Sequence, residues 1–346
     1  MMVLLSHYAS HWMSNLAWVG FASTGVDLFF VLSGYVFAPY ILSHKPLTWT
    51  SHLVRRFFRL YPLYLTALLV YALQRGGMSE TWVEFTRHLF MAHTLGGLDT
   101  AFYFNPAFWS LPPEVEFYLF MPLVIWLVKR FGAWPVFVAA ALARLALVAP
   151  GTSGIIEITA RAISTVHLPG LLVEFMVGVL VFQQSQHSAK PVGRGLVPSR
   201  RLPWLACVGL AAALGLYGWA IAPGPAHTAT LPAVITGNTG MVAALAYGLV
   251  VAAVLTWRLE NIPPFMKHCA NQLGQLSYGI YLFHNAAPAL VIRLMPELAN
   301  AGVRLSLASL CCTVLVAWAA NRLIERPARQ WGRSLAGRSE GAALQK

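Results

Sequence analysis

Histidine and carboxylate side chains inside apolar segments are the residues of this sequence best suited to chemistry. These residues are His7, Asp27, Glu114, Glu116, Glu174 and His284. An ionisable group at membrane depth is costly, so each of them needs a partner or a function. A histidine can take a proton from a hydroxyl near neutral pH, and a carboxylate can hold its ring in place, which together make a general base.

Three of these residues also have a structural interpretation that the sequence leaves open. His7 is either a packing histidine in the first apolar segment or a general base. Asp27 either caps the second apolar helix or orients a histidine and lines a polar cavity. Glu114 follows Pro112 and Pro113, the pattern of a helix start, where the helix dipole stabilises an acid.

The other three residues are harder to assign. Glu116 is two positions from Glu114, about 200° around a helix, so the two carboxylates cannot face one cavity. Glu174 lies too deep in its segment to cap a helix, and we expect a buried partner, in either a structural or a catalytic role. For His284 we expect packing or the lining of a cavity.

An arginine cluster suggests an anion site. Arg55, Arg56 and Arg59 are spaced by three and four positions, so all three can reach one ligand from the surface of a helix. Such charges often only fix the orientation of a membrane protein. The cluster contains no lysine, however, and the planar guanidinium group favours bidentate binding of phosphate.

The composition places these residues in a membrane protein. Hydrophobic residues make up 58% of the 346 residues and charged residues only 10%, against about 25% charged in soluble domains. The apolar segments do not alternate as barrel strands do, so we predict an all-α, polytopic bundle of about ten transmembrane helices. The predicted spans are 1–14, 25–42, 60–74, 109–129, 133–149, 165–185, 203–222, 236–256, 275–295 and 302–324.

The distribution of positive charge predicts the topology. Most of the 24 Lys and Arg residues fall in the segments 43–59, 130–132, 186–202, 257–274 and the C-terminal tail if both termini are cytoplasmic. The net charge of +12 is therefore read as a topology signal, and no nucleic-acid partner is expected. Segment 82–96 is amphipathic and is predicted to lie in the membrane interface. The predicted partner is the lipid bilayer; the oligomeric state is left open.

One domain boundary follows from composition. Residues 1–332 form the predicted membrane domain, and the polar segment 333–346 is predicted to be a disordered cytoplasmic tail. Because the chain starts inside an apolar run, we expect a truncated N-terminus. The four cysteines lack the spacing of metal ligands and are interpreted as packing residues, so no metal site is predicted; they are Cys207, Cys269, Cys311 and Cys312.

Five motifs, in order and spacing, resemble the acyltransferase-3 family of multi-pass membrane enzymes over nearly the whole chain. They read GVDLFFVLSGYVF at 25–37, VRRFFRLYPLYL at 54–65, FWSLPPEVEFYLFMPL at 108–123, LSYGIYLFH at 276–284 and IERPARQW at 324–331. The first three motifs are the more specific. Members of that family move an acyl group, often acetyl from acetyl-coenzyme A, onto hydroxyls of extracytoplasmic glycans or related molecules.

The resemblance implies residue roles and an activity. His7 matches the essential histidine of the first helix, Arg56 and Arg59 match the Arg-x-x-Arg motif, and Glu114 matches the glutamate after Trp-Ser-Leu. On this basis His7, Glu114 and Asp27 are assigned to catalysis, with Glu114 or Asp27 orienting His7. Arg55 joins Arg56 and Arg59 in holding an acyl-coenzyme A donor, expected to be acetyl-coenzyme A. No permanently bound cofactor is expected, and the acceptor is a carbohydrate or another hydroxyl compound.

Two departures and two rival functions accompany this interpretation. The family usually carries an arginine about ten residues before the histidine, which would fall before Met1, and Val115 stands where many members have a second acid. A catalytically inactive, truncated relative is therefore one alternative. The other is a transporter or flippase of a glycan or lipid-linked substrate, although no internal repeat is visible. The expected location is the bacterial cytoplasmic (inner) membrane.

Overall fold

The chain is helical throughout the part that the structure describes. The computed structural model describes residues 1–13, 16–42, 48–75, 79–148, 166–188, 201–221, 237–256 and 262–343, and its regular elements in these ranges are all helices. The longer ones are α1 (Met2–Met13), α3 (Gly25–Ile41), α4 (Trp49–Arg75), α5 (Ser79–Leu89), α7 (Leu111–Phe131), α8 (Ala133–Val148), α10 (Leu168–Ser188), α11 (Leu202–Ile221), α13 (Thr239–Leu255), α14 (Pro264–Phe283), α15 (Ala287–Leu294), α16 (Val303–Ala320) and α17 (Arg326–Ala343).

Shorter helical pieces connect the longer helices. They are α2 (Ala17–Phe21), η1 (Ala22–Thr24), η2 (His93–Gly96), α6 (Leu98–Ala101), η3 (Pro106–Ser110), η7 (Pro296–Leu298) and a π-helical segment, η8 (Asn321–Glu325). Six helical stretches in the described ranges are long and apolar enough to cross a membrane, and α8 and α13 are shorter apolar helices. The all-α membrane bundle is confirmed, while the number of ten crossings stays a prediction. Residues 43–47, 189–200 and 257–261 of the predicted cytoplasmic loops lie outside the described residues.

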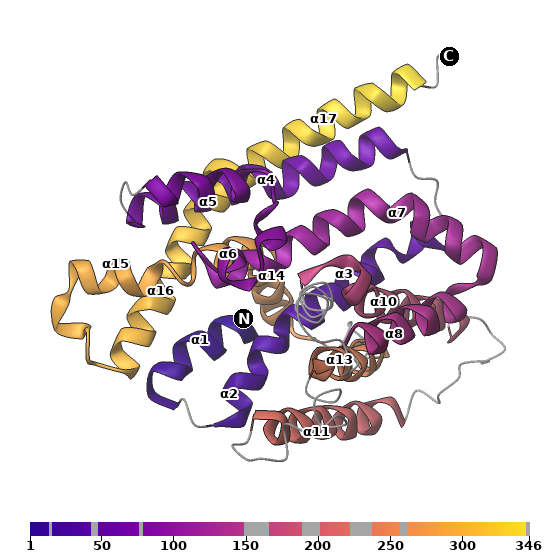
Figure 1. The fold of residues 1–346 in the computed structure, drawn as a ribbon, viewed down its shortest axis with the longest axis horizontal. Helices are drawn as coiled ribbons and strands as arrows, with labels where there is room; N and C mark the ends of the chain where they lie inside the picture. Colours follow the sequence, from indigo (N-terminus) through magenta and orange to yellow (C-terminus); the bar gives the residue numbers. More distant parts are fainter. Residues whose placement is uncertain are drawn as a thin grey trace.

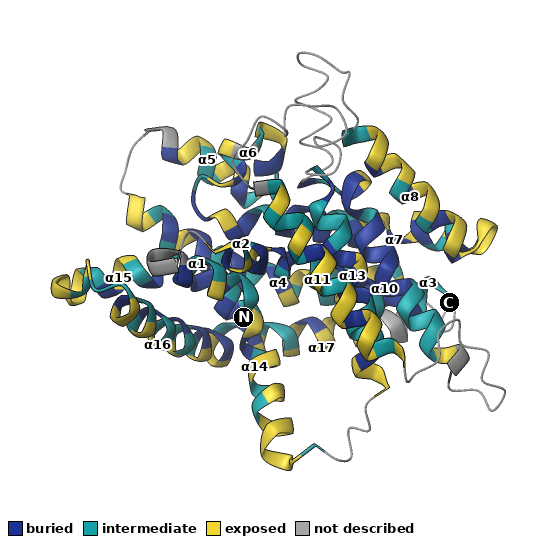
Figure 2. Cartoon of the chain, turned by 90° about the horizontal axis from the view of Figure 1, so that it is seen from below, coloured by how far each residue is buried: buried dark blue, intermediate teal, exposed yellow. Residues whose placement is uncertain are grey.

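Helices α3 and α10 form the centre of the bundle, with α8 and α13 packed against α10 (Figure 1). Buried residues gather along these central helices, whereas the outer helices carry many exposed residues (Figure 2). The rings of Phe117 and Phe175 stack here with their centroids 4.1 Å apart. Large apolar side chains exposed on the outer helices are expected where lipid is the solvent.

Two glycines bring α3 and α10 into backbone contact. A Cβ atom added to Gly34 would lie 1.8 Å from the carbonyl oxygen of Phe175, and one added to Gly178 would lie 1.9 Å from that of Val31. Small residues at a crossing of membrane helices permit such an approach. The crossing fixes how the polar residues on α3 face those on α10.

Helix α4 is longer than its sequence pattern predicts, and α17 explains why. The predicted span begins at residue 60, but α4 begins at Trp49, and α17 lies alongside its first part (Figure 1). Ser51 donates a hydrogen bond of 3.1 Å to the carbonyl oxygen of Ala336, and Ala336 is fully buried. Residues 333–343 are therefore helical in the structure, where their polar composition predicted a disordered tail. Packing against α4 supplies the stabilisation that composition alone could not reveal.

The predicted span 275–295 is interrupted at His284. Helix α14 ends at Phe283, and α15 begins at Ala287. Pro288 has no N–H, so it cannot donate to the carbonyl oxygen of His284 four residues earlier. Backbone groups freed inside a bilayer need partners from within the protein. Here Tyr8 donates to the carbonyl oxygen of His284 at 2.7 Å.

A second freed carbonyl at the same interruption is satisfied from two sides. The carbonyl oxygen of Leu282 accepts hydrogen bonds from the Tyr71 hydroxyl and the Asn105 amide, each at 3.0 Å. Asn285 donates in turn to the side-chain oxygen of Asn105 at 2.7 Å. The end of α14 is thus held by side chains from three other parts of the chain, which gives His284 a fixed position.

Candidate functional site

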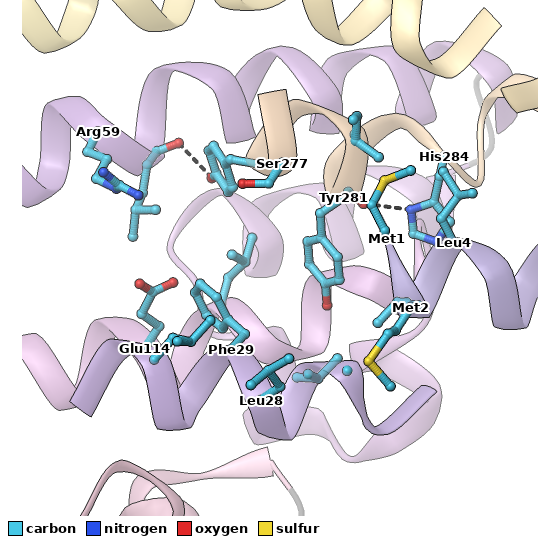
Figure 3. Close-up of a pocket in the computed structure, with 18 residues that line it drawn as sticks. Met1, Met2, Leu4, Leu28, Phe29, Arg59, Glu114, Ser277, Tyr281 and His284 are labelled. Atoms are coloured by element: carbon cyan, nitrogen blue, oxygen red, sulfur yellow. Dashed lines mark hydrogen bonds between the residues drawn. The ribbon is translucent and has the colours of Figure 1, made fainter. Parts of the chain in front are cut away.

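A cavity of about 380 Å³ runs between α3, α4, α7, α14 and the start of α1. Arg59 and Glu114 lie at one end, Met1, Met2 and His284 lie at the other, and Tyr281 stands between the two ends (Figure 3). The walls between these ends are mostly apolar. The remaining lining residues are Val3, Leu4, Gly25, Val26, Leu28, Phe29, Leu32, Leu60, Leu111, Ser277, Tyr278 and Ile280.

The charged end of this first cavity pairs an acid with an arginine. Glu114 is in the first turn of α7, is buried, and accepts a hydrogen bond from the Tyr118 hydroxyl. Its other carboxylate oxygen has no hydrogen-bond partner among the described residues. Arg59 and Arg56 both lie within electrostatic reach of the carboxylate. An acid that is close to two cations and buried can help to hold a guanidinium group in place.

The three arginines do not share one environment. Arg59 lines the first cavity, whereas Arg55 and Arg56 are absent from its lining. The guanidinium carbon of Arg56 lies 4.5 Å from the centroid of the Phe37 ring, so this side chain stacks on an aromatic face behind the cavity. Helical spacing allowed all three residues to reach one ligand, but the packing of α4 directs only Arg59 into this cavity.

A second cavity, of about 270 Å³, adjoins the first. His7 and Asp27 line it, together with residues from η1, η3, α11 and α13. Val3, Val26 and Tyr281 line both cavities and form the wall between them. The remaining lining residues of the second cavity are Ser23, Thr24, Phe102, Pro106, Ala107, Trp109, Tyr217, Thr239 and Gly240.

The two histidines meet at this wall. The ring centroids of His7 and His284 are 5.0 Å apart, although His7 lines the second cavity and His284 the first. Nδ1 of His284 lies 2.7 Å from the carbonyl oxygen of Tyr281, so Nδ1 carries a proton and donates it. A histidine is therefore present on each side of the wall. The sequence motif around His284 marked this residue but did not indicate that it adjoins His7.

Asp27 belongs to a buried charge cluster that sequence reasoning had not assembled. Glu174 on α10 and Arg144 on α8 form an ion pair of 3.2 Å, and both lie within electrostatic reach of Asp27. The Arg144 guanidinium also donates to the carbonyl oxygens of Gly170 and Gly237, and its Nε donates to the side chain of Asn238. Glu174 thus has the buried partner that was expected, and the missed residue is Arg144, whose signal was an isolated arginine inside a predicted span.

Removing the cation of this cluster is expected to destabilise the protein strongly. Arg144→Met leaves the buried Glu174 and the half-buried Asp27 without this positive partner, which should cost about 3 to 5 kcal/mol. Glu174→Gln leaves Arg144 within electrostatic reach of Asp27 and should cost less. The midpoint of thermal unfolding in detergent measures both effects. A methionine variant as stable as the unmodified protein would contradict this account of the cluster.

Glu116 has a structural position. Its carboxylate accepts a hydrogen bond from the backbone N–H of Leu168 at 2.7 Å and one from Nδ1 of His167 at 2.6 Å. The first of these bonds satisfies an N–H at the start of α10, as a helix cap does. Glu116 thereby ties α7 to the start of α10 and, as predicted, faces away from the environment of Glu114.

The structure groups the predicted residues in two sets. Arg59 shares the first cavity with Glu114, and His7 shares the second with Asp27. Glu114 and His7 line different cavities, whereas Asp27 lines the same cavity as His7. Asp27 lines the second cavity and Arg59 lines the first.

Comparison with known proteins finds one family model. A family model described as an acyltransferase domain matches residues 1–322, nearly the whole chain. The search of curated proteins and the search of solved structures each find no match. The match includes both cavities and all the residues placed around them, and it ends within η8, before α17.

Proposed function

The chain belongs to the acyltransferase-3 family of membrane proteins, and from this membership we propose that it transfers an acyl group from acyl-coenzyme A to a hydroxyl. The acyl group proposed is acetyl, and the acceptor is an extracytoplasmic glycan or a related hydroxyl compound. The proposed location is the bacterial cytoplasmic membrane, with both termini inside. Family membership supports acyl transfer; the donor, the acyl group and the acceptor belong to the proposal.

One observation carries this proposal: the first cavity joins a cationic end to a histidine end through apolar walls. Arg59 offers a guanidinium group to the phosphates of a coenzyme A donor. The cavity follows α3 from Gly25 to Leu32, roughly 10 Å along the helix axis at 1.5 Å per residue. A slender pantetheine arm could extend along these walls and bring its thioester to the wall that carries the two histidines.

The second cavity is the proposed place of the acceptor. His7 would remove the hydroxyl proton while the oxygen attacks the thioester carbonyl, and the carbon–sulfur bond would then break. Asp27, in the same cavity, would favour the protonated form of His7 by its negative charge. Glu114 would act at the donor end, by holding Arg59 in place. In this arrangement Asp27, and not Glu114, would act on His7.

Release of free coenzyme A tests the activity directly. Membranes that contain the protein would be given acetyl-coenzyme A and a panel of glycan and small hydroxyl acceptors. The expected result is acceptor-dependent release of free coenzyme A, with the acetyl group recovered on the acceptor. Movement of a labelled acceptor across the membrane without release of coenzyme A would instead support the transporter alternative.

Neutralising Arg59 is expected to weaken donor binding. A charge-assisted hydrogen bond contributes about 1.5 to 3 kcal/mol, so Arg59→Gln should raise the KM for acyl-coenzyme A about tenfold or more. The KM for the acceptor should change little, because Arg59 does not line the second cavity. Steady-state kinetics with each substrate varied in turn measure both constants.

Arg130→Gln is the matched control for this variant. Arg130 is exposed at the end of α7 and lines neither cavity, yet its replacement removes the same charge. If both variants raised the KM for acyl-coenzyme A equally, the loss of net charge would explain the effect. An unchanged KM in Arg59→Gln would leave Arg59 as a topology charge only.

A further inference from the structure

The interruption between α14 and α15 presents the His284 ring at the wall between the cavities. The side chain is fully buried in the protein, yet it lines the first cavity. The main chain around it is held by Tyr8, Tyr71 and Asn105. A helix interrupted at membrane depth with its backbone groups satisfied in this way is typical of functional positions, where a broken helix lines a cavity.

The hydrogen bond at Nδ1 determines what the other ring nitrogen can do. Because Nδ1–H donates to the carbonyl oxygen of Tyr281, Nε2 of the neutral ring carries a lone pair. This Nε2 is buried and has no hydrogen-bond partner among the described residues. A buried acceptor without a partner is unusual in a folded protein and calls for an explanation, such as a group that is present only when substrate binds.

The neighbouring His7 ring limits the pair to one added proton, beyond the single N–H proton that each neutral ring carries. With centroids 5.0 Å apart inside an apolar bundle, two imidazolium cations would repel each other strongly. The one added proton can nevertheless reside on either ring. His7 faces the second cavity and His284 faces the first, so the pair forms a path between two spaces that are otherwise separated by Val3, Val26 and Tyr281.

We propose that His7 and His284 form a proton shuttle, in which His284 is the general acid that protonates the leaving thiolate of the donor. This inference rests on the proposed function. The hydroxyl oxygen of the acceptor bonds to the acyl carbon, and its proton passes to His7. His7 passes this proton to Nε2 of His284. The carbon–sulfur bond breaks, the electron pair goes to sulfur, and His284 delivers the proton from Nε2 to that sulfur. Both rings end neutral, so the acceptor proton ends on the thiol and no other reactant is needed.

The proposal explains why each cavity needs its own histidine. The acceptor loses a proton in the second cavity, whereas the thiolate needs one in the first. A single imidazole would have to reach both atoms through the wall that both cavities share. A proton carried between adjacent rings requires no such movement, and the interruption of α14 fixes His284 where the transfer ends.

The test uses a donor whose leaving group needs no acid. The full-length protein in membranes or detergent is assayed with acetyl-coenzyme A and with its selenoester analogue, in which selenium replaces the sulfur and departs as the anion at neutral pH. His284→Asn keeps an amide that can donate to the carbonyl oxygen of Tyr281, but it has no titratable nitrogen. His268→Asn, at an exposed position of α14, the helix that ends just before His284, is the matched control.

The expected result is a selective defect. His284→Asn should transfer acyl from the thioester about 100-fold more slowly than the unmodified protein, and it should recover to within about tenfold with the selenoester. His7→Asn should be slow with both donors, because it acts on the acceptor. Equal loss with both donors in His284→Asn, or no loss with the thioester, would overturn the shuttle alone. An unmodified protein that transfers acyl from neither donor would overturn the proposed function and the shuttle with it.

Discussion

Replacing His7 with alanine is expected to slow acyl transfer by about 10²- to 10⁴-fold, the usual contribution of a general base. The hydroxyl of the acceptor would keep its proton as its oxygen attacks the thioester, and no other described side chain of the second cavity has an imidazole to replace His7. The KM for the donor should change little, since His7 does not line the first cavity. Initial rates of coenzyme A release at saturating donor and acceptor measure the effect.

Leu5→Ala on the same helix controls for damage to α1. Leu5 is 47% exposed and carries no polar group, so its loss should leave the rate close to that of the unmodified protein. Both variants should insert and elute from gel filtration as the unmodified protein does. Full acyl transfer by His7→Ala would remove His7 from the mechanism.

Adding one methyl group at Gly178 is expected to produce a large loss of stability. The new Cβ would lie 1.9 Å from the carbonyl oxygen of Val31 and 2.5 Å from the backbone nitrogen of Tyr35. Both neighbours are backbone atoms of α3, so no side-chain rotation can relieve the overlap. Gly178→Ala should therefore lower the free energy of unfolding by about 3 kcal/mol or more, at the upper end for overpacked cores. The midpoint of thermal unfolding in detergent would fall accordingly.

Gly215→Ala tests whether alanine is harmful as such. Gly215 is exposed on α11, and a Cβ there would meet no atom within 4 Å. Alanine is the better helix former by about 1 kcal/mol, so this variant should be at least as stable as the unmodified protein. If the two variants unfolded at the same temperature, the close crossing of α3 and α10 would not limit stability.

Sequence patterns predicted the class of the fold but not the ends of several helices. Apolar length and low charge indicated an all-α membrane bundle, because each span must satisfy its own backbone inside lipid. The start of α4 was predicted at residue 60 instead of Trp49, because the segment before residue 60 is polar and packs on α17. The interruption at His284 was also missed: Pro288 was visible, but the donors that make the interruption tolerable come from distant residues.

The residues of the site were visible one by one, while their grouping was not. Arg59 and Glu114 were singled out by type and motif, and so were His7 and Asp27. Helical spacing could not say that Arg56 turns towards Phe37 while Arg59 enters a cavity. In a membrane helix the outward face is as apolar as the inward face, so the hydrophobic pattern does not reveal which side chains face the protein interior.

The sequence by itself determined the membrane class, the short list of ionisable residues and the resemblance that family comparison confirmed. These properties depend on composition and on local spacing, which a single chain displays directly. Only the tertiary structure decided that Arg144 partners the buried acids, that His7 and Glu114 line different cavities, and that His284 adjoins His7. The physical reason is that these relations depend on how closely helices cross, and a crossing such as that of Gly34 and Gly178 joins residues far apart in the chain.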